Sequence, residues 1–232
     1  MALELAMRTF SNDKLLVEER RKHIVMHSSK VFTKRGFDQT NMRKVAEACG
    51  MSAGTLYHYF GSKEEILYSI INTATSDQAK YIEEYGESLK TVKPTDGLRR
   101  LIEELIKWHD SNQDITLFIY QETRCLPQTM RETIFASEER ILAVFEEILV
   151  RGIEAGEFAI KEPKLMAHNI IVIGHSWAFR RWFLREHFTL EKYIKEQTDT
   201  ILQAITTGCN HRKAELNTGA LKLSRAFKGD SK

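Results

Sequence analysis

The fold is decided by one stretch of the sequence, residues 50–67, which reads GMSAGTLYHYFGSKEEIL. Small residues come directly before a cluster of aromatic side chains, and a Gly-Ser-Lys-Glu-Glu run follows them. Leu56, Tyr59 and Phe60 have the i, i+3, i+4 spacing that places side chains on one face of a helix. We therefore expect a short helix whose aromatic face is buried and whose opposite face is small and open.

The residues before this stretch predict two helices. A first helix, from about Glu18 to Arg35, ends at Gly36, because glycine readily adopts the left-handed conformation of a helix C-terminus. Thr40 is expected to cap a second helix, Asn41 to Cys49. Only the tight turn Gly50-Met51-Ser52 then separates the second helix from the third.

The stretch itself contains the start of two helices. Ser52 can cap the third helix, which is expected to run from Ala53 to about Phe60. Ser62 and Glu65 form the capping box S-x-x-E before a fourth helix, which we expect to continue to near Gly86.

The second and third helices, joined by a glycine-containing turn, have the pattern of a helix-turn-helix. In that motif the second helix lies in the major groove of DNA and its first residues approach the base edges. Small side chains there let the backbone come close, and the free amides at the positive end of the helix dipole suit a phosphate. Tyr57 and His58 can donate hydrogen bonds to phosphates, and Lys63 adds positive charge. This pattern predicts a DNA-binding surface.

The charge distribution supports the same interpretation. The whole chain of 232 residues has a net charge of only +2. Residues 20–63, however, contain nine basic and two acidic residues, so this segment carries +7 and the remainder carries −5. A basic N-terminal module on a mildly acidic body indicates a polyanionic partner for the first part of the chain.

The composition predicts an all-α protein, because only 3 prolines and 12 glycines interrupt a chain that is 42% hydrophobic and 28% charged. The fold expected is an N-terminal three-helix helix-turn-helix domain followed by a larger C-terminal helical domain for ligand binding and dimerisation. Further helices are expected near 95–110, 113–125, 128–155, 163–186 and 189–207. The predicted divisions are a flexible arm (1–17), the DNA-binding domain (18–62), the ligand-binding and dimerisation domain (63–208) and a basic, disordered tail (209–232).

Several other classes of protein are disfavoured by the sequence. The three cysteines show no CxxC spacing, so neither a zinc site nor a disulfide framework is expected. The N-terminus does not resemble a signal peptide, and the most apolar stretch, 169–179, is too short to span a bilayer. His168 and His175 share a helix face, but no further metal-ligand motif or catalytic fingerprint accompanies them. We expect a cytoplasmic protein that is not an enzyme, binds no membrane and needs no cofactor or metal.

The segment 20–67 resembles the DNA-binding domain of the TetR family of transcriptional regulators. It reads RRKHIVMHSSKVFTKRGFDQTNMRKVAEACGMSAGTLYHYFGSKEEIL. Matches to the family pattern occur at Ile24, Val31-Phe32, Gly36-Phe37, Thr40, Val45-Ala46, Gly50-Met51-Ser52, Gly54-Thr55-Leu56-Tyr57, Tyr59-Phe60 and Ser62-Lys63-Glu64. Ser28 stands where the family usually has alanine, a small change in packing.

This resemblance implies a homodimer that binds a palindromic double-stranded DNA operator and pairs through its last two long helices. It also implies a ligand pocket in the C-terminal domain and a fourth helix that carries the signal from the pocket to the DNA. By the same likeness, the residues expected to contact phosphate are Thr40, Ser52, Thr55, Tyr57, His58 and Lys63. The candidates for contact with base edges are Arg43, Ala53 and Gly54.

A second segment, 175–202, reads HSWAFRRWFLREHFTLEKYIKEQTDTIL and is similar to the ends of TetR-family regulators that respond to acyl-CoA thioesters, the FadR and KstR types. A pocket for an acyl chain would use apolar residues of the C-terminal domain. The candidates for this pocket are Trp108, Leu117, Phe118, Tyr120, Met166, Ile170, Ile173, Gly174, Trp177 and Arg181. The phosphates of CoA would need cations, and Arg180, Arg181 and Arg185 could supply them. These aromatic residues could equally be core residues, and the arginines could be contacts between the two subunits of a dimer.

The sequence therefore predicts a ligand-responsive DNA-binding repressor, released from its operator by a small hydrophobic effector such as an acyl-CoA. One alternative is a multidrug-type sensor that represses efflux genes, which would need acidic residues in its pocket. Another is a DNA-binding regulator that has no small-molecule ligand.

Overall fold

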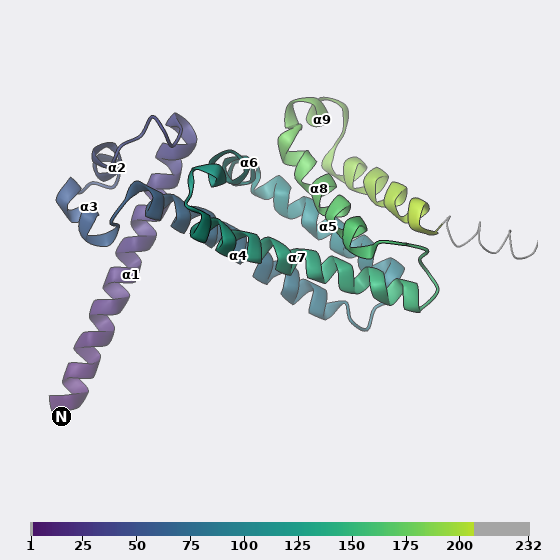
Figure 1. Cartoon of the computed structure of the whole chain (residues 1–232), viewed down its shortest axis with the longest axis horizontal. Helices are drawn as coiled ribbons and strands as arrows, with labels where there is room; N and C mark the ends of the chain where they lie inside the picture. The colour runs from purple at the N-terminus through teal and green to yellow at the C-terminus, as the bar shows by residue number, and fades with distance from the viewer. Residues whose placement is uncertain (1, 207–232) are drawn as a thin grey trace, which may run out of the picture. The chain divides into compact units, whose positions relative to one another are not determined.

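The computed structural model describes residues 2–206, and the side chains from 14 onward. Within these residues every regular element is a helix, which confirms the predicted all-α class (Figure 1). The elements are α1 (Ala2–Arg35), α2 (Met42–Ala48), α3 (Ala53–Tyr59), α4 (Lys63–Ser88), α5 (Pro94–Ser111), α6 (Gln113–Glu122), a 3₁₀ turn (Thr123–Cys125), α7 (Gln128–Glu154), α8 (Pro163–Phe179), α9 (Arg181–His187) and a last helix whose described part is 190–206. The predicted tail, 209–232, lies outside the described residues.

The chain forms two compact units. The first comprises the chain up to Asp77 together with Asp114–Ser137, and the second comprises Gln78–Gln113 and the chain from Glu138 onward. Helices α4 and α7 therefore each contribute residues to both units. The predicted domain limits were placed by sequence motifs alone, and they stay a prediction.

The first unit has a core built from the short helices and the helices around them. Leu56 and Phe60 of the α3 region are fully buried with Phe32 of α1 and Val45 of α2, as the helical spacing predicts. Phe118 of α6 belongs to the same cluster. Burial of these large side chains fixes α3 against the rest of the unit, since a seven-residue helix is only marginally stable alone.

The helix boundaries follow local signals at most positions. Gly36 and Gly50 have φ values of 81° and 67°, the left-handed conformation expected of them. The Ser52 hydroxyl accepts a hydrogen bond from the Thr55 amide, as predicted for the cap of α3. Ser62 likewise accepts from the Glu65 amide at the start of α4.

Three boundaries differ from the prediction. Asn41, and not Thr40, caps α2, because its side chain accepts from the Lys44 amide while the Thr40 hydroxyl donates to the Gly36 carbonyl. Helix α1 begins at Ala2 and not near Glu18, in a segment that contains neither proline nor glycine to stop it. The helix predicted at 163–186 is divided at Arg180, whose φ and ψ of −108° and 24° leave the helical range.

The second unit is centred on α5 and α8, which pack against each other. Gly174 allows their close approach, because a Cβ atom at this position would lie 2.8 Å from the Leu105 Cδ2 atom. The Asp110 Oδ1 atom accepts hydrogen bonds from Gln113, Trp177 and Arg185, so one carboxylate oxygen joins α5 to the start of α6, α8 and α9.

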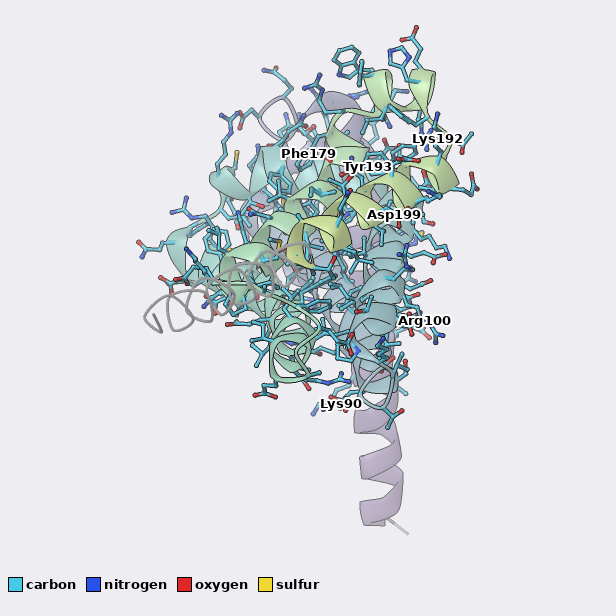
Figure 2. All side chains as sticks on the ribbon, turned by 90° about the vertical axis from the view of Figure 1, so that its right-hand side faces the viewer. Lys90, Arg100, Phe179, Lys192, Tyr193 and Asp199 are labelled. Carbon is cyan, nitrogen blue, oxygen red and sulfur yellow. The ribbon has the colours of Figure 1, made fainter. Side chains whose placement is uncertain are left out.

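The last helix packs on this core through polar and apolar contacts. The Tyr193 hydroxyl donates to the Ile173 carbonyl and lies 2.8 Å from the Ser176 hydroxyl. Asp199 forms an ion pair with Arg99 of α5 at 2.8 Å, and Figure 2 shows both Tyr193 and Asp199 on this helix. No helix among the described residues is long and apolar enough to cross a membrane.

Candidate DNA-binding surface and effector-binding domain

The predicted recognition helix, α3, presents a small and exposed N-terminus. Ser52, Gly54 and Thr55 are all exposed, and Ala53 is half-buried. The Ser52 and Thr55 hydroxyls lie 2.8 Å apart, so both are held at the helix start. The space beside Gly54 is open, since a Cβ atom there would meet only the Ser52 hydroxyl, at 3.8 Å. A phosphate or a base edge can therefore approach the backbone of this turn.

The side chains of the α3 region divide between two faces, in agreement with the prediction except at Tyr59. Leu56 and Phe60 are buried and Tyr59 is half-buried, whereas Tyr57 is 54% exposed and His58 is also exposed. The His58 ring stands edge-on to Tyr59, with ring centroids 5.5 Å apart. Tyr57 and His58 thus leave polar atoms free for an external acceptor, which is what their predicted phosphate contacts require.

Lys63 connects the start of α4 to the loop between α1 and α2. Its ammonium donates to the Phe37 carbonyl at 2.9 Å and to the Thr40 carbonyl at 3.0 Å, and it lies 4.0 Å from the Phe37 ring centroid. An ammonium has three donors, so one remains for a phosphate. Thr40 is buried, and its hydroxyl donates a hydrogen bond to the Gly36 carbonyl. The hydroxyl oxygen can therefore only accept a further hydrogen bond.

Helix α2 adds further positive charge to this unit. Arg43, the predicted base-contacting residue, is exposed. A groove of about 350 Å³ lies between α1 and α2, and its lining contains four cations and one acid: Lys30, Lys34, Arg35, Lys44 and Glu47. The sequence reveals these cations only as net charge, because α1 and α2 are separate segments and their proximity appears only in the fold.

Helix α1 makes two polar contacts that the sequence analysis missed. The Arg21 Nη1 atom donates to the Tyr59 carbonyl at 2.7 Å, and its guanidinium carbon lies 4.2 Å from the Phe60 ring centroid. The His23 Nε2 atom lies 3.3 Å from the Cys49 carbonyl, at the C-terminus of α2. Both helices of the helix-turn-helix therefore have their C-terminal ends against α1.

The predicted pocket residues are divided between the two units. Leu117, Phe118 and Tyr120 belong to the first unit, where Phe118 is buried in the core and Tyr120 is 55% exposed. The other candidates belong to the second unit: Trp108, Met166, Ile170, Ile173, Gly174, Trp177 and Arg181. Their role as a common pocket stays a prediction.

The candidates in the second unit occupy different environments. Ile170, Gly174 and Trp177 are buried on the side of α8 that packs in the core. Trp108 stacks on Tyr81 with ring centroids 5.3 Å apart. Met166 lines an open cavity of about 220 Å³ between the N-terminal part of α8 and the last helix.

The α8–α9 region contains three arginines, and one of them, Arg180, lies beside aromatic rings. Arg185 donates to the Asp110 carboxylate at 2.9 Å. The Arg180 guanidinium lies 5.1 Å from the ring centroid of Trp182, which is 68% exposed. Arg181 is also exposed. This arrangement provides cations and an exposed indole ring in one place.

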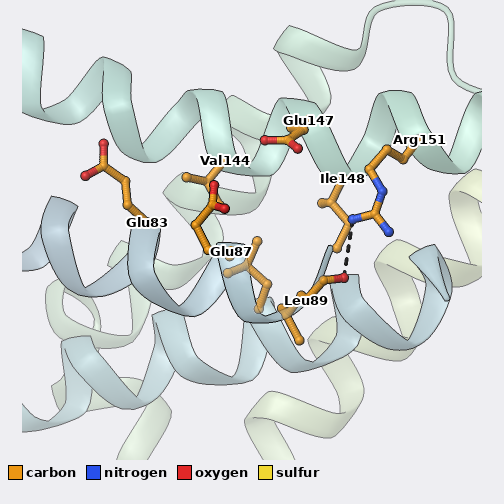
Figure 3. Close-up of a pocket in the computed structure, with 9 residues that line it drawn as sticks. Glu83, Glu87, Leu89, Val144, Glu147, Ile148 and Arg151 are labelled. Atoms are coloured by element: carbon orange, nitrogen blue, oxygen red, sulfur yellow. Dashed lines mark hydrogen bonds between the residues drawn. The ribbon is translucent and has the colours of Figure 1, made fainter. Parts of the chain in front are cut away.

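A small, partly open pocket lies between α4, α5 and α7 (Figure 3). Its volume is about 50 Å³, well below the roughly 300 Å³ at which small-molecule sites begin. Arg151 crosses its rim and donates to the Leu89 carbonyl at 3.3 Å. This cavity is therefore a packing gap in the second unit and is too small for an acyl chain.

Two histidines are buried in the second unit. His109 of α5 and His175 of α8 have ring centroids 4.4 Å apart, and the His109 Nε2 atom lies 3.2 Å from the Gln78 amide nitrogen of α4. Burial lowers the pKa of His109 well below its usual value, and it lowers that of His175 to about 4. Each pKa is lowered further by a neighbouring histidine. His109 and His175 are core residues, whereas His168 is exposed.

Comparisons with known proteins agree with this geometry. The family described as "Bacterial regulatory proteins, tetR family" matches residues 24–70, and the family "Tetracyclin repressor-like, C-terminal domain" matches residues 91–205. The HTH-type transcriptional regulator HbdR of Aromatoleum sp. (strain CIB) is 27% identical over 192 residues, 82% of each chain.

Solved structures share the fold. AibR, in complex with isovaleryl coenzyme A and operator DNA, superimposes with a TM-score of 0.67 at 21% identity over 78% of this chain and 97% of that one. FadR of Bacillus subtilis, in complex with stearoyl-CoA, has a TM-score of 0.61 at 19% identity over 81% of this chain and 98% of that one. The helix-turn-helix and the helical second unit thus both have counterparts in known regulators.

Proposed function

Because the chain belongs to the TetR family of bacterial transcriptional regulators, we propose that it is a homodimeric repressor that binds a palindromic operator and leaves it when a small hydrophobic effector binds. Its helix-turn-helix is the DNA-binding element. The dimer forms through the last two long helices, α8 and residues 190–206.

The observation that carries this proposal is the surface of α3. A capped, uncrowded helix start at Ser52 and Gly54 stands beside the exposed Tyr57 and His58, with a lysine at the start of the next helix. The amides at this end of α3 suit a phosphate, and the small side chains let the helix enter the major groove. The DNA contacts that we propose are those of the sequence prediction apart from Thr40, whose buried hydroxyl donates to Gly36 and so has no proton for a phosphate.

Release from DNA follows from a shift between two arrangements of the dimer. A palindromic operator requires two recognition helices about 34–36 Å apart, one turn of DNA. An effector that prefers an arrangement in which the recognition helices have a different separation lowers the affinity for the operator. The size of this loss is set by the difference between the effector's affinities for the two arrangements. Helix α4 begins directly after α3 and ends in the second unit, so it is the element through which the effector acts.

The effector class that we propose is an acyl-CoA. Two proteins of the same fold are known with isovaleryl coenzyme A and stearoyl-CoA bound. In this chain, Arg180 and Arg181 offer exposed cations for the CoA phosphates, and the exposed Trp182 offers a ring on which an adenine can stack.

A multidrug-type sensor is the second candidate, and one residue favours it. Glu138 of α7 has a pKa raised by burial, and a partly buried carboxyl group is what a pocket for a hydrophobic cation requires. A regulator without any small-molecule ligand is the third candidate, and it would release DNA in response to neither class of compound.

The test begins with DNA selection by the full chain from a pool of random 30-bp duplexes. The duplex recovered, called the preferred duplex below, is expected to contain an inverted repeat. Gel shifts are then titrated with isovaleryl-CoA, stearoyl-CoA, free CoA and tetraphenylphosphonium. Release by an acyl-CoA but not by free CoA supports the proposal.

Each other outcome identifies a different failure. Release only by tetraphenylphosphonium would favour the multidrug sensor, and release by none would leave a regulator without these ligands. Failure to select any sequence would contradict the DNA-binding proposal itself.

A further inference from the structure

The C-terminal end of α3, opposite the predicted DNA contacts at its N-terminus, is anchored to α1. Arg21 is 38 residues before Tyr59 in the sequence, yet its Nη1 atom donates to the Tyr59 carbonyl at 2.7 Å. The same guanidinium lies 4.2 Å from the ring centroid of Phe60, the residue that ends α3. One side chain thus contacts both the last residue of the helix and its C-cap.

The chemistry of a helix C-terminus explains why a cation suits this position. The last carbonyls of a helix have no intrahelical partner, and they carry the negative end of the helix dipole. Phe60 is extended, with φ −139° and ψ 120°, so α3 cannot continue and satisfy the Tyr59 carbonyl itself. A planar guanidinium can donate in its plane and stack on a ring with its face, which an ammonium cannot do.

The contact is placed where it can set the orientation of α3. The Ser52 hydroxyl fixes the N-terminus of the helix, and Leu56 fixes its inner face by burial. Arg21 fixes the third point, the C-terminus, against α1. His23 occupies the equivalent place for α2, with its Nε2 atom 3.3 Å from the Cys49 carbonyl. The two polar contacts together hold both helices of the motif on one side of α1.

We propose that Arg21 is a positioning residue for DNA recognition, which sets the orientation of α3 through Tyr59 and Phe60 and thereby favours the preferred sequence over others. This inference rests on the proposed function of α3 as the element that contacts the bases. Arg21 acts through α3, so its removal weakens discrimination between sequences and leaves the general attraction to phosphates intact.

The adjacent Arg20 provides a matched control. Arg20 has the same charge and is exposed, but of the two arginines it is Arg21 that contacts Tyr59 and Phe60. The variants to compare are Arg21→Met, Arg21→Lys and Arg20→Met, each in the full chain, with a thermal melt to confirm that each is folded.

The first measurement is binding to the preferred duplex and to a scrambled duplex of the same composition, each at several KCl concentrations. Arg21→Met is expected to reduce the ratio of the two affinities about tenfold, the usual size of a lost charged hydrogen bond, with an unchanged salt slope on the scrambled duplex. Arg21→Lys is expected to restore part of the ratio, and Arg20→Met to keep it. An equal loss on both duplexes with a slope lowered by about one would make Arg21 a phosphate contact and overturn the inference.

The second measurement needs no DNA. Hydrogen exchange of residues 53–60 is expected to be about tenfold faster in Arg21→Met than in Arg20→Met, because the end of α3 loses its anchor. Equal exchange in the two variants would contradict the positioning role. If the wild-type chain selects no DNA while the two variants still differ in exchange, the anchor is retained but the proposed function, and with it the role of Arg21 in recognition, is refuted.

Discussion

Lys63 donates a hydrogen bond of 3.0 Å to the carbonyl of Thr40, and this bond ties the start of α4 to the loop before α2. The predicted phosphate contact is therefore also a structural contact. The lysine holds the loop between α1 and α2 in place through the carbonyl groups of two buried residues, Phe37 and Thr40, and it keeps one donor for a phosphate.

Replacing Lys63 by alanine is expected to have two separate effects. Loss of the bonds to Phe37 and Thr40 should lower the free energy of unfolding by about 1–2 kcal/mol. Loss of the phosphate contact should lower the slope of log affinity against log salt concentration by about one. Denaturant unfolding and binding isotherms at several salt concentrations measure the two effects. Lys80→Ala, on the exposed side of α4, is the control, and a variant with only the stability loss would refute the phosphate contact.

Ser52 allows the cap of α3 to be separated from its contact with DNA. Ser52→Ala removes the acceptor for the Thr55 amide and should cost about 1 kcal/mol of stability. Ser52→Asp keeps an equally good cap but places a negative charge beside the phosphate. The Asp variant should thus be the more stable of the two and the weaker in binding the preferred duplex. Binding that followed stability instead would show that Ser52 acts only as a cap.

Two helical glycines are expected to respond oppositely to alanine. At Gly54 the space is open, so Gly54→Ala should raise the free energy of unfolding by about 0.5–1 kcal/mol and weaken DNA binding. At Gly174 the new methyl group would lie 2.8 Å from Leu105, so Gly174→Ala should cost about 1–3 kcal/mol. Thermal melts and gel shifts of both variants test this. Unchanged DNA affinity in Gly54→Ala would argue against close approach of the backbone to DNA.

The buried histidines predict a loss of stability in mild acid. The pKa of His175 is about 4 in the folded chain against about 6.5 when unfolded, so the unfolded state binds more protons between these values. The free energy of unfolding should be highest above about pH 6.5. It should decline as the pH falls below that value, and His175 should account for a loss of about 2 kcal/mol at pH 5. His109 acts in the same direction.

Denaturant unfolding at pH 8, 6 and 5 measures this dependence. His175→Phe should reduce it, since an apolar ring fills the same space without a proton to gain. His58→Gln, at an exposed position of the first unit, is the control. An identical pH dependence in wild type and His175→Phe would contradict the assignment.

The sequence predicts much of the first unit because its signals are local. Glycine at 36 and 50 and serine at 52 and 62 each act on backbone groups within a few residues, so their roles can be recognised from spacing. Thr40 and Asn41 are adjacent residues that both cap helices well, so spacing could not decide between them. Arg21 was missed because its partners are 38 residues away and no periodic pattern connects them.

The second unit was less predictable for a related reason. An apolar helix face has the same sequence pattern whether it lines a pocket or packs in a core, so the pattern does not decide between these roles for the buried Ile170 and Trp177. No glycine or proline lies at the break at Arg180, so the sequence does not predict that the helix ends there. Its two flanking helices are instead joined to α5 through Asp110, a contact between residues far apart in the chain.

That single carboxylate oxygen has a consequence for the lifetime of the folded second unit. Asp110 is 67 residues from Trp177 and 75 from Arg185, so its bonds close long segments of chain. Because closing such long segments costs entropy before the contact forms, we expect these bonds to form after the local helices and to contribute little to the folding transition state. Asp110→Asn should therefore accelerate unfolding more than it slows folding. The junction of α5, α8 and α9 then determines how rarely the domain opens, and so its resistance to proteolysis during the life of the cell.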